Sequence, residues 1–409
     1  MRILLVHNFY RSSIPSGENI VFRAESQLLR DHGYEVEEFT RSNDEELDAP
    51  LRTRAEAALL MPWNPRSAGR MREALARFRP DVVHVHNTFP LLSPSVVAEC
   101  GRSGIPVVCT LHNYRLFCAA TVALRNDRVC TVCIDRKSSA PALLYGCYNG
   151  SRLKTLPLAL TIAVHRRRGT WQNNVRTFLA LSEHHRERLI AAGLPGERIE
   201  VKPNFAPPPN RILPWQQREQ LALFVGRLSP EKGCETLINA WLRWGDAAPS
   251  LEIIGDGPDR NRLEELARTG IPGKIRFLGR VPSEAVRERL CLARLVIQPA
   301  LWLETFGMTV IEAYSYGVPV IASRIGSLAS LVRDTETGFL FEPGNVSELT
   351  STLVRCWADQ QRMEQMGQKG REHYELRYSP FANLQLLRKI YDRAIASKPR
   401  ENVSAAAAH

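Results

Sequence analysis

Short apolar runs alternate with segments whose apolar residues recur at helical spacing, from one end of the chain to the other. Apolar runs of this length between helical segments are typical of buried strands in a parallel sheet. The pattern therefore predicts repeated strand–helix units. The expected strands of the first half are 3–7, 35–40, 81–86, 106–112, 177–181 and 199–202, and those of the second half are 221–225, 251–254, 275–278, 295–298 and 319–322.

A proline-rich segment at 202–210 separates the two halves. Successive prolines lack amide donors and resist both helix and central strand, which is typical of a linker. We therefore expect two α/β domains with doubly wound parallel sheets, at 1–205 and 206–379, that face each other across a cleft at the carboxyl ends of their strands. A last helical stretch follows at 380–396, and the tail 397–409 has nothing to bury and is expected to fray.

Composition narrows the class of protein. With 409 residues, 44% of them hydrophobic and 24% charged, the chain is typical of a soluble globular protein. Its longest uncharged apolar stretch, 156–164, is about half of the roughly 20 residues that span a bilayer. The apolar N-terminal run is too short for a signal-peptide core, so we interpret it as a first strand and expect a cytoplasmic protein. The net charge of +11 is compatible with nucleic acid, anionic lipid or phosphorylated substrates.

Three motifs in the second half carry the functional signal. The segment Glu304-Thr-Phe-Gly-Met-Thr-Val-Ile-Glu312 places seven residues between two glutamates, and it is preceded by Gly226-Arg-Leu-Ser-Pro-Glu-Lys-Gly233 and Gly255-Asp-Gly-Pro258. In this order and spacing they resemble the signature of the retaining, nucleotide-sugar-dependent glycosyltransferases of family 4. That resemblance implies the GT-B fold of two Rossmann-like domains, with the helix at 380–396 crossing back to the first domain. It also implies transfer of a hexose from a UDP- or GDP-sugar.

A departing nucleoside diphosphate gains negative charge, which a cation must neutralise. The sequence contains no Asp-x-Asp motif to hold a divalent metal for this purpose. Arg227 and Lys232, on the turn after an expected strand, can supply a planar fork and a point charge instead. We therefore assign catalytic roles to both, expect them to bind the donor, and expect no catalytic cofactor.

The resemblance assigns further donor contacts around the two glutamates. In similar enzymes the glutamate that matches Glu304 contacts the sugar hydroxyls, and the one that matches Glu312 binds the ribose. We count Glu304 among the catalytic residues. Phe306 lies between them, and the amides of Gly307 and Met308 at a helix start can face phosphate or sugar. Eight residues of helix rise about 12 Å, whereas paired glycosidase carboxylates lie about 5–9.5 Å apart. The glutamates are therefore expected to bind rather than to act as acid and base.

Weaker signals come from other strand ends. The resemblance places backbone groups near Val281 against the base, Gly17 against the diphosphate and His112 against the donor sugar or its phosphate, where His112 would be catalytic. Gly17 lies in a Ser-Gly-Glu sequence that also suits a plain turn and helix cap. A histidine at a strand end is equally often structural. His7, His84 and His86 also fall at strand ends and remain open as acceptor-side groups.

An insert at about 114–150 carries Cys118, Cys130, Cys133 and Cys147. A Cys-x-x-Cys pair with two flanking cysteines can supply four thiolates to a tetrahedral structural zinc, which would hold a loop and take no part in catalysis. Free cysteines are also commonly small buried hydrophobes, so both interpretations stand.

Residues 152–171 combine an apolar middle, five Lys or Arg, no acid and a tryptophan. This composition is typical of a helix on an anionic membrane surface, and equally of a buried helix with a solvated basic end. In the first case the protein is peripheral on the cytoplasmic face, and the acceptor is a polyprenyl-linked saccharide rather than a free one.

Other functional classes fit less of the sequence. A basic, zinc-containing nucleic-acid-binding protein would leave the glutamate pair unexplained and lacks stacking motifs and recognition modules, so we expect no nucleic-acid partner. A nucleotide-sugar binder or an epimerase on the same fold remains an alternative.

Overall fold

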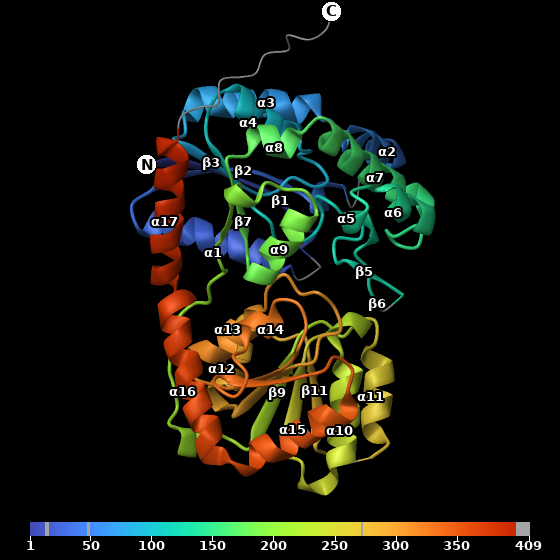
Figure 1. Ribbon diagram of the computed structural model, residues 1–409, viewed down its shortest axis with the longest axis vertical. Coiled ribbons are helices and arrows are strands. Elements are labelled where there is room, and N and C mark those ends of the chain that lie inside the picture. The colour runs from blue at the N-terminus through green and yellow to red at the C-terminus, as the bar shows by residue number, and fades with distance from the viewer. Residues whose placement is uncertain (13–15, 47–49, 127, 271–272, 398–409) are drawn as a thin grey trace, which may run out of the picture.

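The computed structural model describes residues 1–12, 16–46, 50–126, 128–270 and 273–397, which form two α/β lobes stacked along the long axis (Figure 1). The first lobe has a parallel six-stranded sheet in the order β2-β1-β3-β4-β7-β8. Its strands are β1 (Arg2–Phe9), β2 (Glu35–Ser42), β3 (Val82–Asn87), β4 (Val107–Thr110), β7 (Thr177–Ala180) and β8 (Ile199–Val201).

The second lobe repeats the arrangement with a parallel sheet in the order β11-β10-β9-β12-β13-β14. Its strands are β9 (Leu221–Val225), β10 (Ser250–Ile254), β11 (Ile275–Gly279), β12 (Leu295–Gln298), β13 (Val320–Ser323) and β14 (Gly338–Phe341). The predicted α/β fold with two doubly wound parallel sheets is thus confirmed. Sequence analysis missed β14, a buried four-residue strand that begins with glycine.

Helices cover both faces of the first sheet, because alternate strand residues point to opposite sides. Leu4 and Val6 of β1 belong to one apolar cluster, and Ile3 and Leu5 belong to another on the opposite face. The helices of this lobe are α1 (Gly17–Asp31), α2 (Leu51–Leu60), α3 (Pro65–Phe78), α4 (Ser95–Arg102), α5 (Val132–Asp135), α6 (Ala140–Tyr145), α7 (Arg152–Arg167), α8 (Thr170–Asn174) and α9 (Glu183–Ala191). A short antiparallel hairpin, β5 (Leu124–Arg125) and β6 (Arg128–Val129), projects from it.

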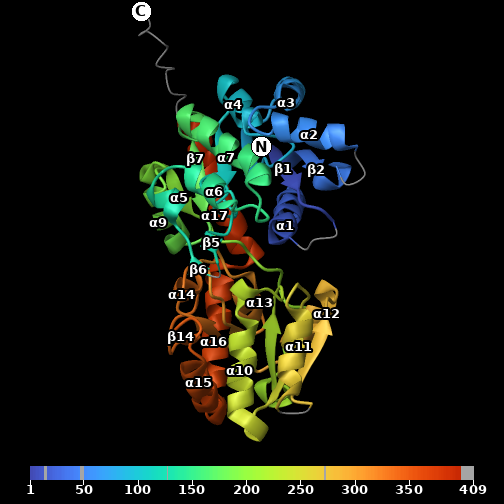
Figure 2. The same ribbon diagram turned by 90° about the vertical axis from the view of Figure 1, so that its right-hand side faces the viewer.

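Around the second sheet lie α10 (Cys234–Trp244), α11 (Arg260–Arg268), α12 (Ser283–Leu292), α13 (Met308–Ser315), α14 (Leu328–Leu331), α15 (Val346–Ala358) and α16 (Gln360–Arg377). The last helix, α17 (Pro380–Ala396), continues from α16 but runs along the first lobe (Figure 2). It buries Leu384, Leu387, Ile390, Tyr391 and Ala394 in the cluster that contains Ile3 and Leu5. Residues 202–214 join the lobes without helix or strand.

Helix α1 carries an unusual residue on its buried face. Its N-terminus is capped by Ser16, whose hydroxyl accepts a hydrogen bond from the amide of Asn19. The side chains that face the sheet include Val21, Phe22 and Leu29, at helical spacing. Glu25 lies in the middle of this apolar face and is completely buried. A carboxylate in such a position needs charged or hydrogen-bonding partners.

Candidate functional site

Two loops at the carboxyl ends of β9 and β12 come together in the second lobe. The amide of Leu301 donates to the carbonyl of Glu231 at 2.8 Å, which joins the loops directly. Gly233 permits this approach: its φ is +69°, and an added Cβ would lie 1.8 Å from the carbonyl oxygen of Pro299. Glycine is therefore required here both for the left-handed backbone and for space.

This junction brings Lys232 and Glu304 together. Their side chains form an ion pair, and the indole Nε1 of Trp302 donates to the same carboxylate oxygen of Glu304 at 3.1 Å. The ammonium of Lys232 also lies 5.0 Å from the centroid of the Trp302 ring. Two of the predicted catalytic side chains thus form one cluster, and Trp302 is a member that sequence analysis did not identify.

Helix α13 begins beside this cluster. Gly307 occupies its N-cap position, where no side chain caps the helix. The first amides of a helix without such a cap are free to bind an acceptor such as phosphate. Met308, the first residue of α13, is half-buried, and Phe306 is buried against the ring of Tyr378 in the core.

Glu312 lies one turn further along α13, on the wall of a cavity of about 170 Å³. The cavity is also lined by Val225 at the end of β9, by Arg287 of α12 and by Tyr316. Burial raises the pKa of the Glu312 carboxyl, and the charge of Arg287 opposes that rise. Sequence analysis missed Arg287 because nothing near it in the sequence marks it as facing Glu312.

The remaining predicted donor residues lie at strand ends or helix starts. Arg227 follows β9 and is exposed. Val281 follows β11 and is half-buried, and the nearby cavity is lined by Ser283 instead. Gly17 is the exposed first residue of α1, and nothing lies within 4 Å of the Cβ that a larger residue would carry.

His112 connects the first lobe to this region. It lies two residues beyond the end of β4 and is 8% exposed. Its carbonyl accepts a 2.7 Å hydrogen bond from the hydroxyl of Thr305, which follows Glu304 in the second lobe. Its ring nitrogen Nε2 lies 3.0 Å from Nδ1 of His86. This interdomain hydrogen bond joins His112 to the residue next to Glu304 in the sequence.

A small cavity beside His112 contains a second carboxyl group. It is lined by His86, His112, Arg115 and Glu18, among other residues. The side-chain Nδ2 of Asn113 donates to Oε1 of Glu18 at 2.5 Å, while Oε2 of Glu18 is buried without a hydrogen-bond partner. Burial raises the pKa of Glu18 to about 7, although Arg115 opposes the rise. Sequence analysis did not select Glu18.

Comparison with family models accounts for nearly the whole chain. The model described as Glycosyltransferase Family 4 matches residues 15–208, and the model described as Glycosyl transferases group 1 matches residues 210–373. The chain belongs to the family 4 glycosyltransferases. The boundary between the two matches falls in the segment that joins the lobes.

Individual relatives of this glycosyltransferase chain match it over part of their length. The D-inositol 3-phosphate glycosyltransferase of Corynebacterium glutamicum is 32% identical over 240 residues, 54% of this chain and 54% of the relative. The GDP-mannose-dependent alpha-(1-6)-phosphatidylinositol monomannoside mannosyltransferase of Mycolicibacterium smegmatis is 29% identical over 224 residues, 50% of this chain and 58% of the relative. The chain thus spans about half the length of the curated relatives it matches.

A solved structure supports the GT-B fold over the whole chain. The Anabaena protein Alr3699/HepE in complex with UDP superimposes with a TM-score of 0.64 at 19% identity, covering 96% of this chain and 100% of that protein.

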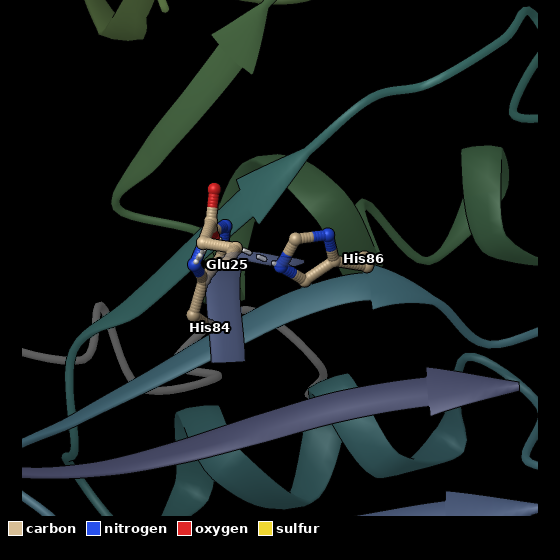
Figure 3. Close-up of side chains that lie close together, drawn as sticks. All are labelled: Glu25, His84 and His86. Atoms are coloured by element: carbon tan, nitrogen blue, oxygen red, sulfur yellow. Dashed lines mark ion pairs between the residues drawn. The ribbon is translucent and has the colours of Figure 1, made fainter. Parts of the chain in front are cut away.

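The glycosyltransferase also contains a buried polar cluster in its first lobe (Figure 3). Among the described residues, only Glu25, His84 and His86 bring three potential metal-ligand atoms within 4.8 Å of one another. The ammonium of Lys202 lies 2.5 Å from the Glu25 carboxylate, so a cation already occupies this position. Burial alone would raise the pKa of Glu25, but Lys202 and His84 outweigh it and hold this pKa well below its usual value. The cluster is therefore an internal salt bridge rather than a metal site.

The four cysteines of the insert are neighbours around the β5–β6 hairpin. Cys118 precedes the hairpin, and the amide of Cys130 at its end donates to the carbonyl of Ala123 at 2.8 Å. Burial raises the pKa of the Cys133 thiol to about 11, and the charges of Cys118, Cys147 and Cys130 add to the rise. Among the described residues, no three of these sulfur atoms all lie within 4.8 Å of one another, as the ligand atoms of Glu25, His84 and His86 do.

Helix α7 presents an apolar and basic surface. Leu153, Leu156 and Leu160 are exposed at a spacing that puts them on one face, and Leu153 is 80% exposed. Exposed side chains of Leu144, Tyr145 and Tyr148 come from α6 and the segment after it, and exposed basic groups come from Arg152, Lys154, Arg167 and Arg168. We call these ten residues the α7 surface.

Two parts of the membrane expectation for 152–171 are wrong. Trp171 is not an interfacial anchor, because it lies in α8 and is buried in the core of the first lobe. Arg166 points inward, with both terminal nitrogens buried and its guanidinium 5.8 Å from the ring of Phe117. Among the described residues, no helix has both the length and the apolar character needed to cross a bilayer.

Proposed function

We propose that this chain transfers a hexose from a UDP- or GDP-sugar to a saccharide or lipid-linked acceptor, with retention of anomeric configuration and without a catalytic metal. The observation that carries the proposal is the cluster of Lys232, Glu304 and Trp302 at the start of α13, beside the cavity that contains Glu312. Relatives named as glycosyltransferases and a structural neighbour in complex with UDP support the donor class.

The cations of the β9 loop would stabilise the leaving diphosphate. Lys232 is held close to the helix start by Glu304, and exposed Arg227 can swing toward the same position. Charge-assisted hydrogen bonds contribute about 1.5–3 kcal/mol each, and more where water is excluded. Free amides at the start of α13 would add to this anion site.

The two glutamates would orient the donor. A carboxylate that accepts hydrogen bonds suits the vicinal hydroxyls of a ribose or a hexose. Glu312 lies in a cavity beneath the β9 end, where a ribose would reach it, and Glu304 lies nearer the cleft, where the hexose would lie. Once Lys232 turns to phosphate, Glu304 is released to bind sugar hydroxyls. The leaving phosphate itself would help to deprotonate the acceptor on the same face of the sugar.

The acceptor side lies in the first lobe. We infer that the α7 surface rests on an anionic membrane at its cytoplasmic face, which would bring a lipid-linked acceptor to the cleft. Leucines and tyrosines that project into water beside four cations match the chemistry of such a surface.

We also infer that Cys118, Cys130, Cys133 and Cys147 bind one structural zinc ion. Four thiolates in a tetrahedral arrangement would hold the insert that carries the hairpin together. Such an ion would stabilise the acceptor-side lobe and take no part in the transfer.

A panel of nucleotide sugars tests the function. The purified chain is incubated with UDP-glucose, UDP-galactose, UDP-N-acetylglucosamine and GDP-mannose, with and without simple glycosides, and released UDP or GDP is measured. Release from one donor, unaffected by EDTA, is expected. Binding of donor without release would instead indicate a nucleotide-sugar binder, and interconversion of the sugar an epimerase. Turnover abolished by EDTA while the chain stays folded would contradict metal-independent transfer.

A further inference from the structure

A continuous chain of polar contacts leads from the buried Glu25 to His112 at the cleft. The carboxylate oxygen Oε1 of Glu25 lies 3.2 Å from Nε2 of His86. The other ring nitrogen of His86, Nδ1, lies 3.0 Å from Nε2 of His112. None of these three side chains is more than 8% exposed, so water does not compete for the contacts. Figure 3 shows the Glu25 end of this chain.

The charges at the Glu25 end are fixed. Lys202 lies 2.5 Å from Oε2 of Glu25, and both side chains are completely buried. His84 lies 3.1 Å from Oε1 through its Nδ1, while its Nε2 contacts the hydroxyl of Thr110 at 2.7 Å. Glu25 is therefore an anion paired with Lys202, and its carboxylate can only accept hydrogen bonds.

Both histidines of the chain are uncharged at neutral pH. Burial lowers the pKa of His86 to about 4, and His84 adds to the shift. Burial lowers the pKa of His112 well below its usual value, and the neighbouring His86 lowers it further. A neutral imidazole carries one proton, and which nitrogen holds it is set by the partners of the ring.

The charge of Glu25 selects the arrangement of protons. Nε2 of His86 lies 3.2 Å from the carboxylate without hydrogen-bond geometry, so the selection is electrostatic: a lone pair on Nε2 is repelled by the negative charge, whereas a proton there is attracted to it. The proton of His86 is therefore on Nε2, and its Nδ1 can only accept. His112 must then donate from Nε2, and its Nδ1 carries a lone pair. That Nδ1 is not among the buried polar atoms without a partner, and His112 lines the cavity beside the cleft.

We propose that Glu25 and His86 are positioning residues that fix His112 as a neutral imidazole protonated on Nε2, so that its Nδ1 accepts a hydrogen bond from a hydroxyl of the donor sugar. The identity of the ligand rests on the proposed function, whereas the proton arrangement does not. An imidazole of this kind repels a phosphate oxygen, because a lone pair would face an anion. His112 therefore contacts the hexose, and Arg227 and Lys232 contact the diphosphate.

The proton arrangement is tested without any ligand. The full chain is labelled with ¹⁵N-histidine, and two-bond ¹H–¹⁵N correlations are recorded from pH 6 to pH 8, with signals assigned from single histidine variants. We expect His112 and His86 both to be neutral and protonated on Nε2 across this range. An imidazolium at His112, or a proton on its Nδ1, overturns the proposal whether or not the chain transfers sugar.

The positioning role is tested with His86→Gln. A glutamine amide can replace the Nε2 donor to Glu25, but it leaves Nε2 of His112 without its acceptor. We expect the KM for the nucleotide sugar that turns over to rise about three- to tenfold, the value of one neutral hydrogen bond. The affinity for UDP or GDP alone should stay within about twofold, because the nucleotide contacts the second lobe.

The matched control is His84→Asn, which keeps a polar atom near Glu25 at the Nδ1 position but changes a residue that does not contact His112. It should lower the melting temperature without changing the ratio of sugar-nucleotide to nucleotide affinity. Equal effects of the two variants on this ratio, or no effect of His86→Gln, would overturn the positioning role. A wild-type chain that binds neither nucleotide nor nucleotide sugar would refute the proposed function alone.

Discussion

Lys232 and Glu304 are each other's counterion when no donor is bound. Their side chains are 23% and 13% exposed, so either one alone would be a largely buried charge. Removing one partner of a buried pair costs more than the pair itself contributes, because the remaining charge has no compensation. Variants of either residue therefore report on folding as well as on donor binding, and the two effects must be separated.

A double variant makes that separation. Lys232→Met should lower stability by about 1–2 kcal/mol, less than the cost for a completely buried pair, because this pair is partly solvated. Adding Glu304→Gln should recover most of that loss, while nucleotide-sugar binding stays weak in the single and the double variant. Urea denaturation and isothermal titration measure the two quantities. No recovery of stability in the double variant would contradict the pairing.

Glu312 makes a narrower prediction for nucleotide binding. Glu312→Ala should weaken the affinity for UDP or GDP about tenfold or more, because two hydrogen bonds to a ribose diol are lost. Ser315→Ala, a change in the same cavity wall that keeps the carboxylate, is the control. Calorimetry with the free nucleotides measures both variants. Unchanged affinity in Glu312→Ala would remove its ribose role.

Glu18 gives a pH signature. Its pKa of about 7 in the folded chain lies above the usual value of a glutamate. Between about pH 4.5 and pH 7 the folded state therefore binds more protons than the unfolded state, so this group lowers stability as the pH rises through that window. Relative to Glu18→Gln, the wild type should lose thermal stability from pH 5 to pH 7.5. Parallel melting-temperature profiles would show that Glu18 titrates normally.

At the scale of elements, the sequence predicts the features that depend on local hydrophobic pattern, such as the positions of the central strands. Apolar runs located the central strands to within about two residues, and the loop motifs located Lys232, Glu304 and Glu312 at strand ends and on α13. The pattern could not reveal that Glu25 pairs with Lys202, 177 positions away, or that Arg287 faces Glu312. Such partners depend on how helices pack on sheets, which hydrophobic periodicity does not encode.

The α7 surface makes a prediction for membrane binding. Replacing Leu153, Leu156 and Leu160 together by serine should abolish most sedimentation with vesicles of phosphatidylcholine and phosphatidylglycerol, because it removes the apolar contact and keeps the cations. Leu376→Ser, at a leucine that is 77% exposed on α16, is the matched control. Equal sedimentation of the triple variant and the wild type, or none by the wild type, would refute a membrane role for this face.

The insert makes a prediction for zinc. Elemental analysis of the native chain should find about one zinc per molecule, and Cys130→Ser with Cys133→Ser should release it and lower the melting temperature. Cys356→Ser, at a buried cysteine in the core of the second lobe, should lower stability without changing the metal content. A native preparation without zinc would leave the cysteines as buried apolar groups.

At the scale of the whole molecule, the buried ion pair fastens the connection between the lobes. Lys202 is the first residue after β8, where the chain leaves the first sheet, and its partner Glu25 lies on α1. His84, beside the same carboxylate, also contacts the hydroxyl of Tyr391 on α17 at 2.7 Å. One carboxylate thus anchors both segments that pass between the lobes.

Removing the cation should therefore affect more than one lobe. Lys202→Met should cost about 3–5 kcal/mol, since Glu25 would be left as an unpaired buried charge. Lys202→Met with Glu25→Gln should be markedly more stable than the single variant. Chemical denaturation monitored by tryptophan fluorescence measures both. A single variant as stable as wild type would mean that Glu25 is protonated in the folded chain.

The path of α17 bears on how the chain folds during synthesis. The first lobe emerges from the ribosome about 180 residues before the helix that completes its core, the separation between residue 201 and residue 380. Until then, the side of the sheet bearing Ile3 and Leu5 lacks the cover that Leu387, Ile390 and Tyr391 provide. A nascent chain of this kind exposes an apolar face during a little under half of its translation. Its dependence on ribosome-associated chaperones should therefore fall sharply once the last helix has emerged.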